Sequence, residues 1–287
     1  MPDVLVVGDA NPDLLLSGDV APRWGQSEQE VDAALTLGGS AAIVAVALAR
    51  LGVDVALAAA LGDDELGAVT AARLAGVDLG ALQRSAEPTG VSVHLLLGDD
   101  RTILTRSGAI RALDVADACA KIAGVRHVHI ASVFLIPALA ERGGELIAAA
   151  RAAGATVSVD TNFDPAGAFR APAWLRDADE LLPNGEEAMR LTGREDVESA
   201  ARALGTTAAV KLGADGALVV ERGEVSRVPA ATVERVVDSV GAGDAFDAGW
   251  IRARLDGRAA PEAAAFACAC AARTLGAAGA EGLEALA

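Results

Sequence analysis

Short apolar runs alternate along the chain with longer stretches in which apolar residues recur every three or four positions. A continuous run such as Val4-Leu5-Val6-Val7 is typical of a strand buried on both faces, whereas the longer stretches are typical of helices that bury one face. These patterns predict strands at residues 4–7, 53–60, 125–131, 156–160, 180–182 and 208–212, and a late hairpin at residues 217–221 and 225–228. They predict helices at residues 41–51, 63–74, 114–123, 137–153, 197–204, 244–255 and 261–275, and another that begins at Asn184.

From residue 113 onward the strands alternate regularly with helices, which indicates βαβ crossovers. We therefore expect an α/β fold with a mostly parallel central sheet, helices on both of its faces, and a single domain over residues 1–287. Ligands of such sheets bind beyond the carboxyl ends of the strands. The residues that directly follow the predicted strands are thus the first candidates for a functional site.

Two pairs of extended segments have no helix between their members: residues 14–17 with 31–37, and residues 91–97 with 102–105. The turn Gly98-Asp99-Asp100-Arg101 joins the second pair and is typical of a hairpin. We expect both pairs to form a small antiparallel β-sheet lid, inserted at about residues 13–37 and 91–106. Apolar residues fall on both of its faces, so one face would expose an apolar patch unless a partner covers it.

The charge of the chain limits its partners. With a net charge of −16 and lysine only at Lys121 and Lys211, the chain is a poor candidate for binding nucleic acid or an anionic membrane. A bound phosphate would have to be held by backbone amides, a metal ion or a few arginines. Tyrosine is absent and aromatic residues make up 3%, so few side chains could stack on a ligand.

The cysteines Cys119, Cys268 and Cys270 show no metal-binding spacing with the histidines, and we interpret them as reduced thiols of the core. The N-terminus lacks the basic segment of a signal peptide. No apolar run reaches membrane-spanning length without a charge, Gly or Pro. We expect a cytoplasmic protein.

A loop of small residues, Gly241-Ala242-Gly243, precedes Asp244 and a predicted helix. Backbone N–H groups at a helix N-terminus converge on one point at the positive end of the helix dipole, which makes an anion site without lysine or arginine. We expect a positive φ at Gly243. Asp244 is either the N-cap of the helix or a base held beside the bound anion, and for an isolated motif the cap is the better interpretation.

Other polar residues follow other strands, and each has a structural alternative. Asn11-Pro12-Asp13 would be an ordinary turn, and Lys211 a solvated strand end. Asn184 and Glu187 have the spacing of a capping box, which taken alone is the favoured interpretation.

Several common nucleotide-binding and catalytic motifs are absent from the sequence. There is no Gly-x4-Gly-Lys-[Ser/Thr] phosphate loop, and the first strand ends in Gly8-Asp9-Ala10-Asn11, which is no dinucleotide fingerprint. Neither His-Glu-x-x-His nor Gly-x-Ser-x-Gly occurs.

The ordered motifs resemble those of the ribokinase-like (PfkB) family of carbohydrate kinases over essentially the whole length. Residues 238–246, Asp-Ser-Val-Gly-Ala-Gly-Asp-Ala-Phe, match its C-terminal signature with serine in place of threonine. Residues 38–52 match the N-terminal signature, and Gly62-Asp63-Asp64-x-x-Gly67 the segment after it. Asn184-x-x-Glu187 and Lys211-Leu212-Gly213-x-x-Gly216 match two further family motifs.

The resemblance implies in-line transfer of a phosphoryl group from ATP to a hydroxyl group. Asp244 would accept the proton of that hydroxyl, and the N–H groups of Gly241, Ala242 and Gly243 would hold the charge that grows on the transferred group. Mg²⁺, placed through Asn184 and, by way of water, Glu187, would offset the phosphate charge.

The resemblance also implies which residues bind the nucleotide. Lys211, Gly213 and Gly216 would lie at the nucleotide, and Cys268 stands where family members often have an asparagine near the adenine. A monovalent cation such as K⁺ would lie near Asp238 and the backbone carbonyls of residues 276–279.

On the substrate side, Asn11, Asp13, Gly38 and Gly39 would face the sugar hydroxyls under the lid. Ile43 replaces a usual asparagine, which removes one polar contact to the sugar. Asp164 stands where relatives acting on 2-keto-3-deoxygluconate have arginine, and would repel an acid substrate, so we expect a neutral sugar. Arg106 either reaches the substrate or is a surface arginine.

We considered three alternatives to a sugar kinase. The residues leave one of them open and disfavour the other two. A nucleoside kinase of the same family is the substrate alternative. A non-catalytic sugar- or nucleotide-binding protein on the same fold is disfavoured by the intact Asp244, and a nicotinamide-dependent oxidoreductase by the lack of a Gly-rich first turn. Because related kinases pair their lids, the apolar lid predicts a homodimer.

Overall fold

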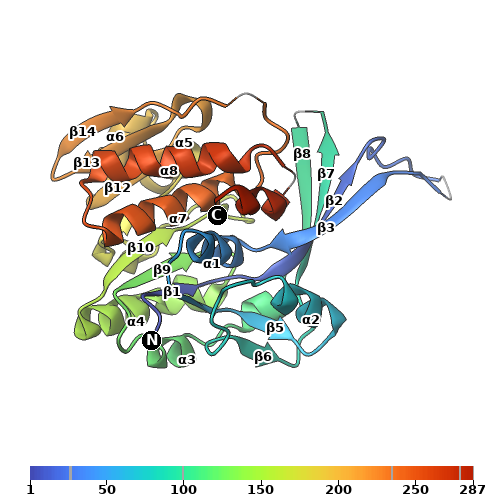
Figure 1. The fold of residues 1–287 in the computed structure, drawn as a ribbon, viewed down its shortest axis with the longest axis horizontal. Coiled ribbons are helices and arrows are strands. Elements are labelled where there is room, and N and C mark those ends of the chain that lie inside the picture. Colours follow the sequence, from blue (N-terminus) through green and yellow to red (C-terminus); the bar gives the residue numbers. More distant parts are fainter. Residues whose placement is uncertain (26–27, 99, 234, 278, 287) are drawn as a thin grey trace.

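A central sheet of eight strands runs through the protein in the order β14-β13-β12-β11-β10-β9-β1-β4 (Figure 1). The structure, a computed structural model, describes residues 1–25, 28–98, 100–233, 235–277 and 279–286. Neighbours from β4 to β12 pair in parallel, and β13 and β14 add an antiparallel edge. The strands are β1 (Val4–Val7), β4 (Val55–Ala58), β9 (His127–Ala131), β10 (Thr156–Asp160), β11 (Glu180–Leu181), β12 (Thr207–Lys211), β13 (Ala217–Glu221) and β14 (Glu224–Val228).

Helices cover both faces of this sheet, as expected. Val4 and Val6 of β1 belong to one buried apolar cluster, and Leu5 and Val7 to another. Both faces of the sheet are therefore buried at β1, which explains why apolar residues follow one another in this strand without alternating with polar ones. The first cluster contains α1 (Ser40–Arg50), α7 (Ala242–Leu255) and α8 (Ala260–Thr274), and the second α3 (Val115–Ala120), α4 (Pro137–Ala153), α5 (Gly185–Thr192) and α6 (Val197–Ala203). Within the described ranges no helix is long and apolar enough to cross a membrane.

A second sheet of four strands, in the order β3-β2-β7-β8, projects from the α/β body as the lid (Figure 1). Its strands are β2 (Asn11–Ser17), β3 (Asp32–Gly38), β7 (Val91–Leu97) and β8 (Asp100–Arg106). The two hairpins are antiparallel, but β2 pairs with β7 in parallel. The expectation of an antiparallel sheet was therefore wrong at its centre, because β2 and β7 both leave the body and run outward side by side. Asp99, in the predicted turn, lies outside the described residues.

Several elements differ from the expected ones. The run at residues 53–60 is divided between β4 and β5 (Ala60–Gly62), and β5 pairs with β6 (Gln83–Ser85), a strand that polar residues concealed. The helix α2 (Glu65–Ala72) is shorter than expected. Four 3₁₀ segments were not predicted: η1 (Gly108–Ala112), η2 (Ala173–Asp177), η3 (Gly213–Asp215) and η4 (Gly279–Leu286).

Candidate active site

Charged side chains gather at the carboxyl edge of the parallel sheet. Asp9 follows β1, Asp160 ends β10 and Lys211 ends β12. Ser40 and Asp244, at the N-termini of α1 and α7, belong to the same group. The Ser40 hydroxyl donates a hydrogen bond to Asp244, and the Ala41 N–H in the first turn of α1 donates one to Asp9. The site therefore forms where an α/β fold is expected to bind its ligand.

The helix α7 begins at Ala242, two residues earlier than expected. Gly241 is the N-cap residue and has φ +80°, a conformation that favours glycine, and the helix starts at Ala242. Gly243 lies inside the first helical turn, so the positive φ expected there was wrong. A Cβ on Gly243 would lie 3.8 Å from the Nζ of Lys211, so this glycine keeps the approach to the lysine open. The N–H of Ala242 donates to the carbonyl of Ser239 over 3.3 Å, a long bond.

Asp244 does not cap its helix. Its Oδ1 accepts a hydrogen bond from the hydroxyl of Ser40, which lies 204 residues earlier in the chain. Burial raises the pKa of Asp244 to about 7, against the lowering effects of the Ser40 hydrogen bond and the Lys211 charge. A carboxyl group poised between its two protonation states near neutral pH has the property that a general base requires.

Lys211 is held between two buried aspartates. Its Nζ lies 2.6 Å from Asp160 Oδ2, and 3.0 and 3.2 Å from the two oxygens of Asp247. Burial alone would lower the pKa of Lys211, but the two carboxylates raise it above its ordinary value, so the ammonium group stays charged. Asp247 was missed by the sequence analysis, although an acid one turn after Asp244 on a helix face that is otherwise apolar was a usable signal.

Asn184 and Glu187 form the capping box of α5. The Asn184 side chain accepts from the Glu187 N–H, and the Glu187 carboxylate from the Asn184 N–H, each over 2.9 Å. The same loop meets the end of β12, because the Lys211 N–H donates to the Pro183 carbonyl. Burial and the negative charge of Asp160 raise the pKa of Glu187 to about 7. Within the described ranges no three acidic, His or Cys side chains are grouped so that they could hold a metal ion, and Mg²⁺ at this edge would be held through water.

The substrate candidates gather where the lid meets the body. Asn11 donates to Asp13 Oδ1 over 2.7 Å, and His94 Nε2 lies 3.1 Å from Asp13 Oδ2. A Cβ on Gly38 would lie 1.9 Å from Asp13 Oδ1, so glycine is required there. Gly39 has φ +86° and precedes α1. The structure therefore brings Asn11, Asp13, Gly38 and Gly39 together, and adds His94, which the sequence analysis missed.

A family model described as pfkB family carbohydrate kinase matches residues 1–285. The chain belongs to this family. The resemblance drawn from the sequence motifs is thereby confirmed.

Relatives with known activities match nearly the whole pfkB-family chain. The ATP-dependent ribose-1-phosphate kinase of Halopiger xanaduensis is 33% identical over 286 residues, which cover 96% of this chain and 93% of that protein. The ribokinase of Haemophilus influenzae is 29% identical, with 93% and 90% covered. The solved ribokinase of Arabidopsis thaliana, complexed with ribose and ATP, has a TM-score of 0.84 at 26% identity and covers 99% of this chain and 98% of its own. The ribokinase-like fold is confirmed.

The structure shows the surroundings of two residues on which the substrate arguments from the sequence rest. The Asp164 carboxylate accepts hydrogen bonds from the N–H groups of Ala166, Ala168 and Phe169, and so holds its own loop. These hydrogen bonds hold the carboxylate in place and leave its negative charge, so the repulsion of an acid substrate by Asp164 stays a prediction. Ile43 is buried and lies against the Gly241 turn, 3.5 Å from where a Cβ of that glycine would be.

Arg106 and Cys268 are two further candidate residues of this pfkB-family chain. Arg106 is exposed at the end of β8, and its charge helps to lower the pKa of Asp64 at the start of α2, after the hydrogen bonds from Thr89 and Gly67. Cys268 is buried in α8 among apolar residues, and burial raises the pKa of its thiol.

Glycines and one aspartate shape the loops on the nucleotide side. Gly216 has φ +85°, and a Cβ there would lie 2.0 Å from the Val228 carbonyl oxygen; Gly213 has φ +60°. Asp238 accepts from the N–H groups of Val240 and Gly279, and thus joins the loop before α7 to the one after α8. Residue 278 of the expected cation loop lies outside the described residues.

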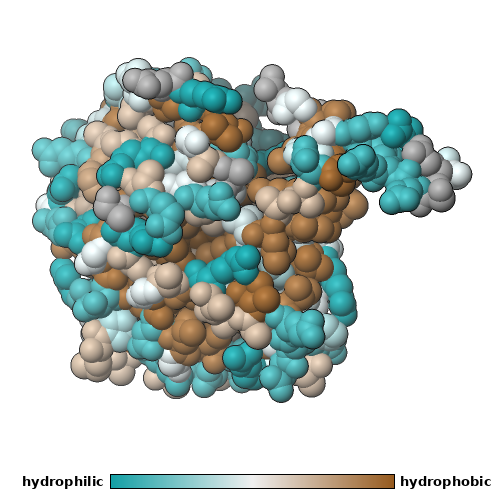
Figure 2. All heavy atoms as spheres, turned by 45° about the vertical axis from the view of Figure 1, so that its right-hand side comes forward, coloured by the Kyte–Doolittle hydropathy of each residue, from teal (hydrophilic) through white to brown (hydrophobic). Residues whose placement is uncertain are grey.

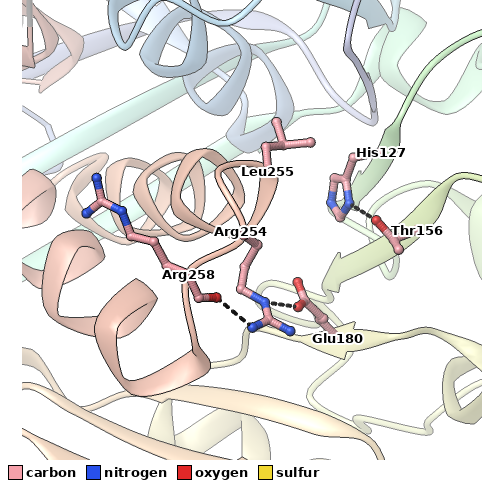
Figure 3. A pocket seen from close by; sticks show the side chains of 7 residues that line it. His127, Thr156, Glu180, Arg254, Leu255 and Arg258 are labelled. Carbon is pink, nitrogen blue, oxygen red and sulfur yellow. Dashed lines mark hydrogen bonds and ion pairs between the residues drawn. The ribbon is translucent and has the colours of Figure 1, made fainter.

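A different hollow, of about 310 Å³, lies at the opposite edge of the sheet, where β9, β10 and β11 begin. Figure 3 shows the side chains that line it. Glu180 accepts hydrogen bonds from Arg254 and from the Trp250 indole, each over 2.7 Å. Both ring nitrogens of His127 are bonded to the hydroxyl groups of Thr156 and Ser158. Because these polar groups satisfy one another, we interpret the hollow as the end of a structural network and assign it no ligand.

Proposed function

We propose that the protein transfers the γ-phosphoryl group of ATP to a hydroxyl group of a small neutral sugar, with Asp244 as the general base. The observation that carries this proposal is the Asp244 carboxyl group itself. It is half-buried at the N-terminal turn of α7, its pKa is near 7, and Ser40 occupies one of its two oxygens. The second oxygen is then available to accept the proton of the sugar hydroxyl.

The surrounding groups would stabilise the transferred phosphoryl group. The N–H groups of Gly241, Ala242 and Gly243 open α7, and phosphate binding would replace the long Ala242–Ser239 bond. Lys211, beside Gly243, would add a positive charge, and Gly213 and Gly216 would let the backbone approach the nucleotide, with Cys268 near the adenine. Mg²⁺, held through water by Glu187 and oriented by Asn184, would offset the phosphate charge. A monovalent cation would bind carbonyls beside Asp238.

The substrate site would lie between Asn11, Asp13, Gly38, Gly39 and the lid, with Arg106 at its outer edge. Support for a sugar comes from the relatives, which include a ribokinase, a ribose-1-phosphate kinase and a fructokinase. A nucleoside kinase is the alternative. Because the Asp164 carboxylate is hydrogen-bonded within its own loop, the panel of tested substrates should also include a sugar acid.

ADP release should be measured with ATP, Mg²⁺ and a panel of ribose, fructose, ribose-1-phosphate, 2-keto-3-deoxygluconate and nucleosides. The proposal expects turnover with ribose or fructose. Turnover with the phosphorylated sugar, the acid or a nucleoside alone would contradict the neutral sugar. Binding of a sugar without any ADP release would favour the non-catalytic alternative.

Gly243→Val is expected to weaken ATP binding about ten- to a hundredfold while the protein stays folded. Gly243 has helical φ, and valine is a better helix former than glycine, so folding should not suffer. The new side chain would instead occupy the space beside Lys211 that the phosphoryl group needs.

Calorimetric titration with an ATP analogue measures this effect, and thermal unfolding reports the fold. Gly257→Ala, just past the C-terminus of the same helix, is the control for general damage to α7: alanine at its φ of +79° should lower the unfolding temperature and leave ATP affinity unchanged. Normal ATP affinity in Gly243→Val would show that this loop is not the phosphate site.

We expect the protein to form a homodimer through the lid. Across its four strands, Leu35, Leu14, Val93 and Leu104 lie in register on the face opposite Asp13. Leu35 and Leu104 are 40% and 57% exposed. Figure 2 shows hydrophobic surface over the lid next to the α/β body. Such a row would be covered by a second copy in a two-fold contact.

Light scattering at micromolar concentration should give the mass of a dimer, and Leu104→Glu should give a monomer. A monomer mass for the unaltered protein would rule out this dimer. Leu79→Glu, at another exposed leucine outside the lid, is the control for the added charge.

A further inference from the structure

A continuous chain of side-chain hydrogen bonds connects Lys211 with Asp244. Asp160 Oδ2 accepts from Lys211 over 2.6 Å and from the Asn162 amide over 3.1 Å. The same amide donates to Ser40 Oγ over 2.9 Å, and Ser40 donates to Asp244 Oδ1. Five side chains thus form a single network: one each from the end of β12 and the starts of α1 and α7, and two from the end of β10.

The geometry of Asn162 is imposed by this network. Its φ is +53°, in the left-handed region where non-glycine residues are uncommon and asparagine is the most tolerated. Its side-chain oxygen accepts from the Ser132 N–H over 2.7 Å, and Ser132 is itself at φ +56° and donates from its hydroxyl to Asp9. Backbone strain of this kind is kept only where the surroundings determine it, and it clusters at functional sites.

The single hydrogen of the Ser40 hydroxyl is donated to Asp244. The hydroxyl oxygen accepts from Asn162, so its own hydrogen is directed to Asp244 Oδ1. This arrangement leaves Oδ2 of Asp244 as the oxygen that can receive a proton.

We propose that Ser40 and Asn162 are positioning residues that orient Asp244 for proton transfer, anchored through Asp160 to Lys211. Neither residue touches the reacting atoms: Ser40 acts on the base directly, and Asn162 acts through Ser40. The inference rests on the proposed role of Asp244 as the base.

Ser40→Ala should lower kcat about ten- to a hundredfold, in line with the loss of a hydrogen bond to a charged group. It should also move the acid limb of kcat/KM to higher pH, because the hydrogen bond from Ser40 lowers the pKa of Asp244. Ser40→Thr, which keeps the hydroxyl, should restore both values. The charged groups that bear on this limb are Asp9 after β1, Asp160 on β10, Lys211 on β12, Glu187 on α5 and Asp247 on α7.

Ser199→Ala is the matched control, since Ser199 also donates to an aspartate, Asp196, at a helix start, but on the exposed surface of α6. It should leave kcat and the pH profile unchanged. If Ser40→Ala reduces the folded fraction, Ser40→Cys, whose thiol is somewhat larger and only a weak donor, should shift kcat and the acid limb in the same direction by a smaller amount.

Asn162→Gly tests the relay, because glycine accepts the left-handed backbone but removes the amide. The double variant with Ser40→Ala should lose less than the product of the two single losses. A loss equal to that product would overturn the relay. An unchanged pH profile in Ser40→Ala, with Asp244→Asn inactive, would overturn the inference and leave the proposed function standing. Full activity in Asp244→Asn would overturn the proposed function itself.

Discussion

Replacing Asp244 with asparagine is expected to slow turnover by about 10²–10⁴-fold, the contribution of a positioned general base. Asparagine has nearly the same shape, and its amide oxygen can still accept from Ser40, so the network should remain. Since the substituted side chain lacks a basic carboxylate, proton transfer from the sugar hydroxyl loses its acceptor. ATP binding and the unfolding temperature should stay close to those of the unaltered protein.

Single-turnover kinetics with ATP and the best sugar of the panel measure this loss. Asp256→Asn, at the other end of α7 and paired with Arg252, is the control for an aspartate substitution on the same helix. Turnover within a few-fold of the unaltered protein would exclude Asp244 as the base.

The pH profile gives an independent readout of the same group. A carboxyl group acts as a base only when it is ionised, and the pKa of Asp244 is about 7. The value of kcat/KM, which reports the free enzyme, should therefore fall as the pH is lowered through about 7. A profile that stays flat from pH 5 to 9 would contradict the assignment.

Lys211→Met should destabilise the protein by about 3–5 kcal/mol at pH 7, the cost of removing one partner from a buried ion pair. Asp160 and Asp247 are both buried, and methionine would leave their carboxyl groups without the ammonium that bonds them. The penalty should shrink as the pH is lowered. Burial already raises the pKa of Asp247 well above its ordinary value, and without the Lys211 charge, which holds the pKa of Asp160 below its ordinary value against burial, Asp160 also becomes easier to protonate.

Urea unfolding at two pH values measures the free energy of unfolding. Lys121→Met is the matched control, since Lys121 is exposed at the end of α3. Adding Asp247→Leu to Lys211→Met should recover part of the loss, because one unpaired carboxyl group disappears. An effect of Lys211→Met no larger than that of Lys121→Met would show that the buried pair does not contribute to stability.

The sequence by itself determined most of the helices and strands of the α/β body, because the spacing of apolar residues and the capping of helices are local properties. The apolar run at residues 4–7 predicts a strand buried on both faces, and β1 is one. Asn184 and Glu187, three residues apart, predict the capping box that opens α5. The sequence also placed Asp244 beside a helix N-terminus, because the small residues 241–243 that open the helix directly precede it in the chain.

Only the tertiary structure decided which distant side chains meet. The hydroxyl that holds Asp244 comes from Ser40, and Lys211 meets Asp160 from another strand and Asp247 from α7. No local pattern encodes such contacts, because they depend on strand order and on how α1 and α7 cross the sheet edge. The parallel pairing of β2 with β7 was hidden for the same reason: a hairpin pattern specifies its own two strands but not the neighbour of the hairpin.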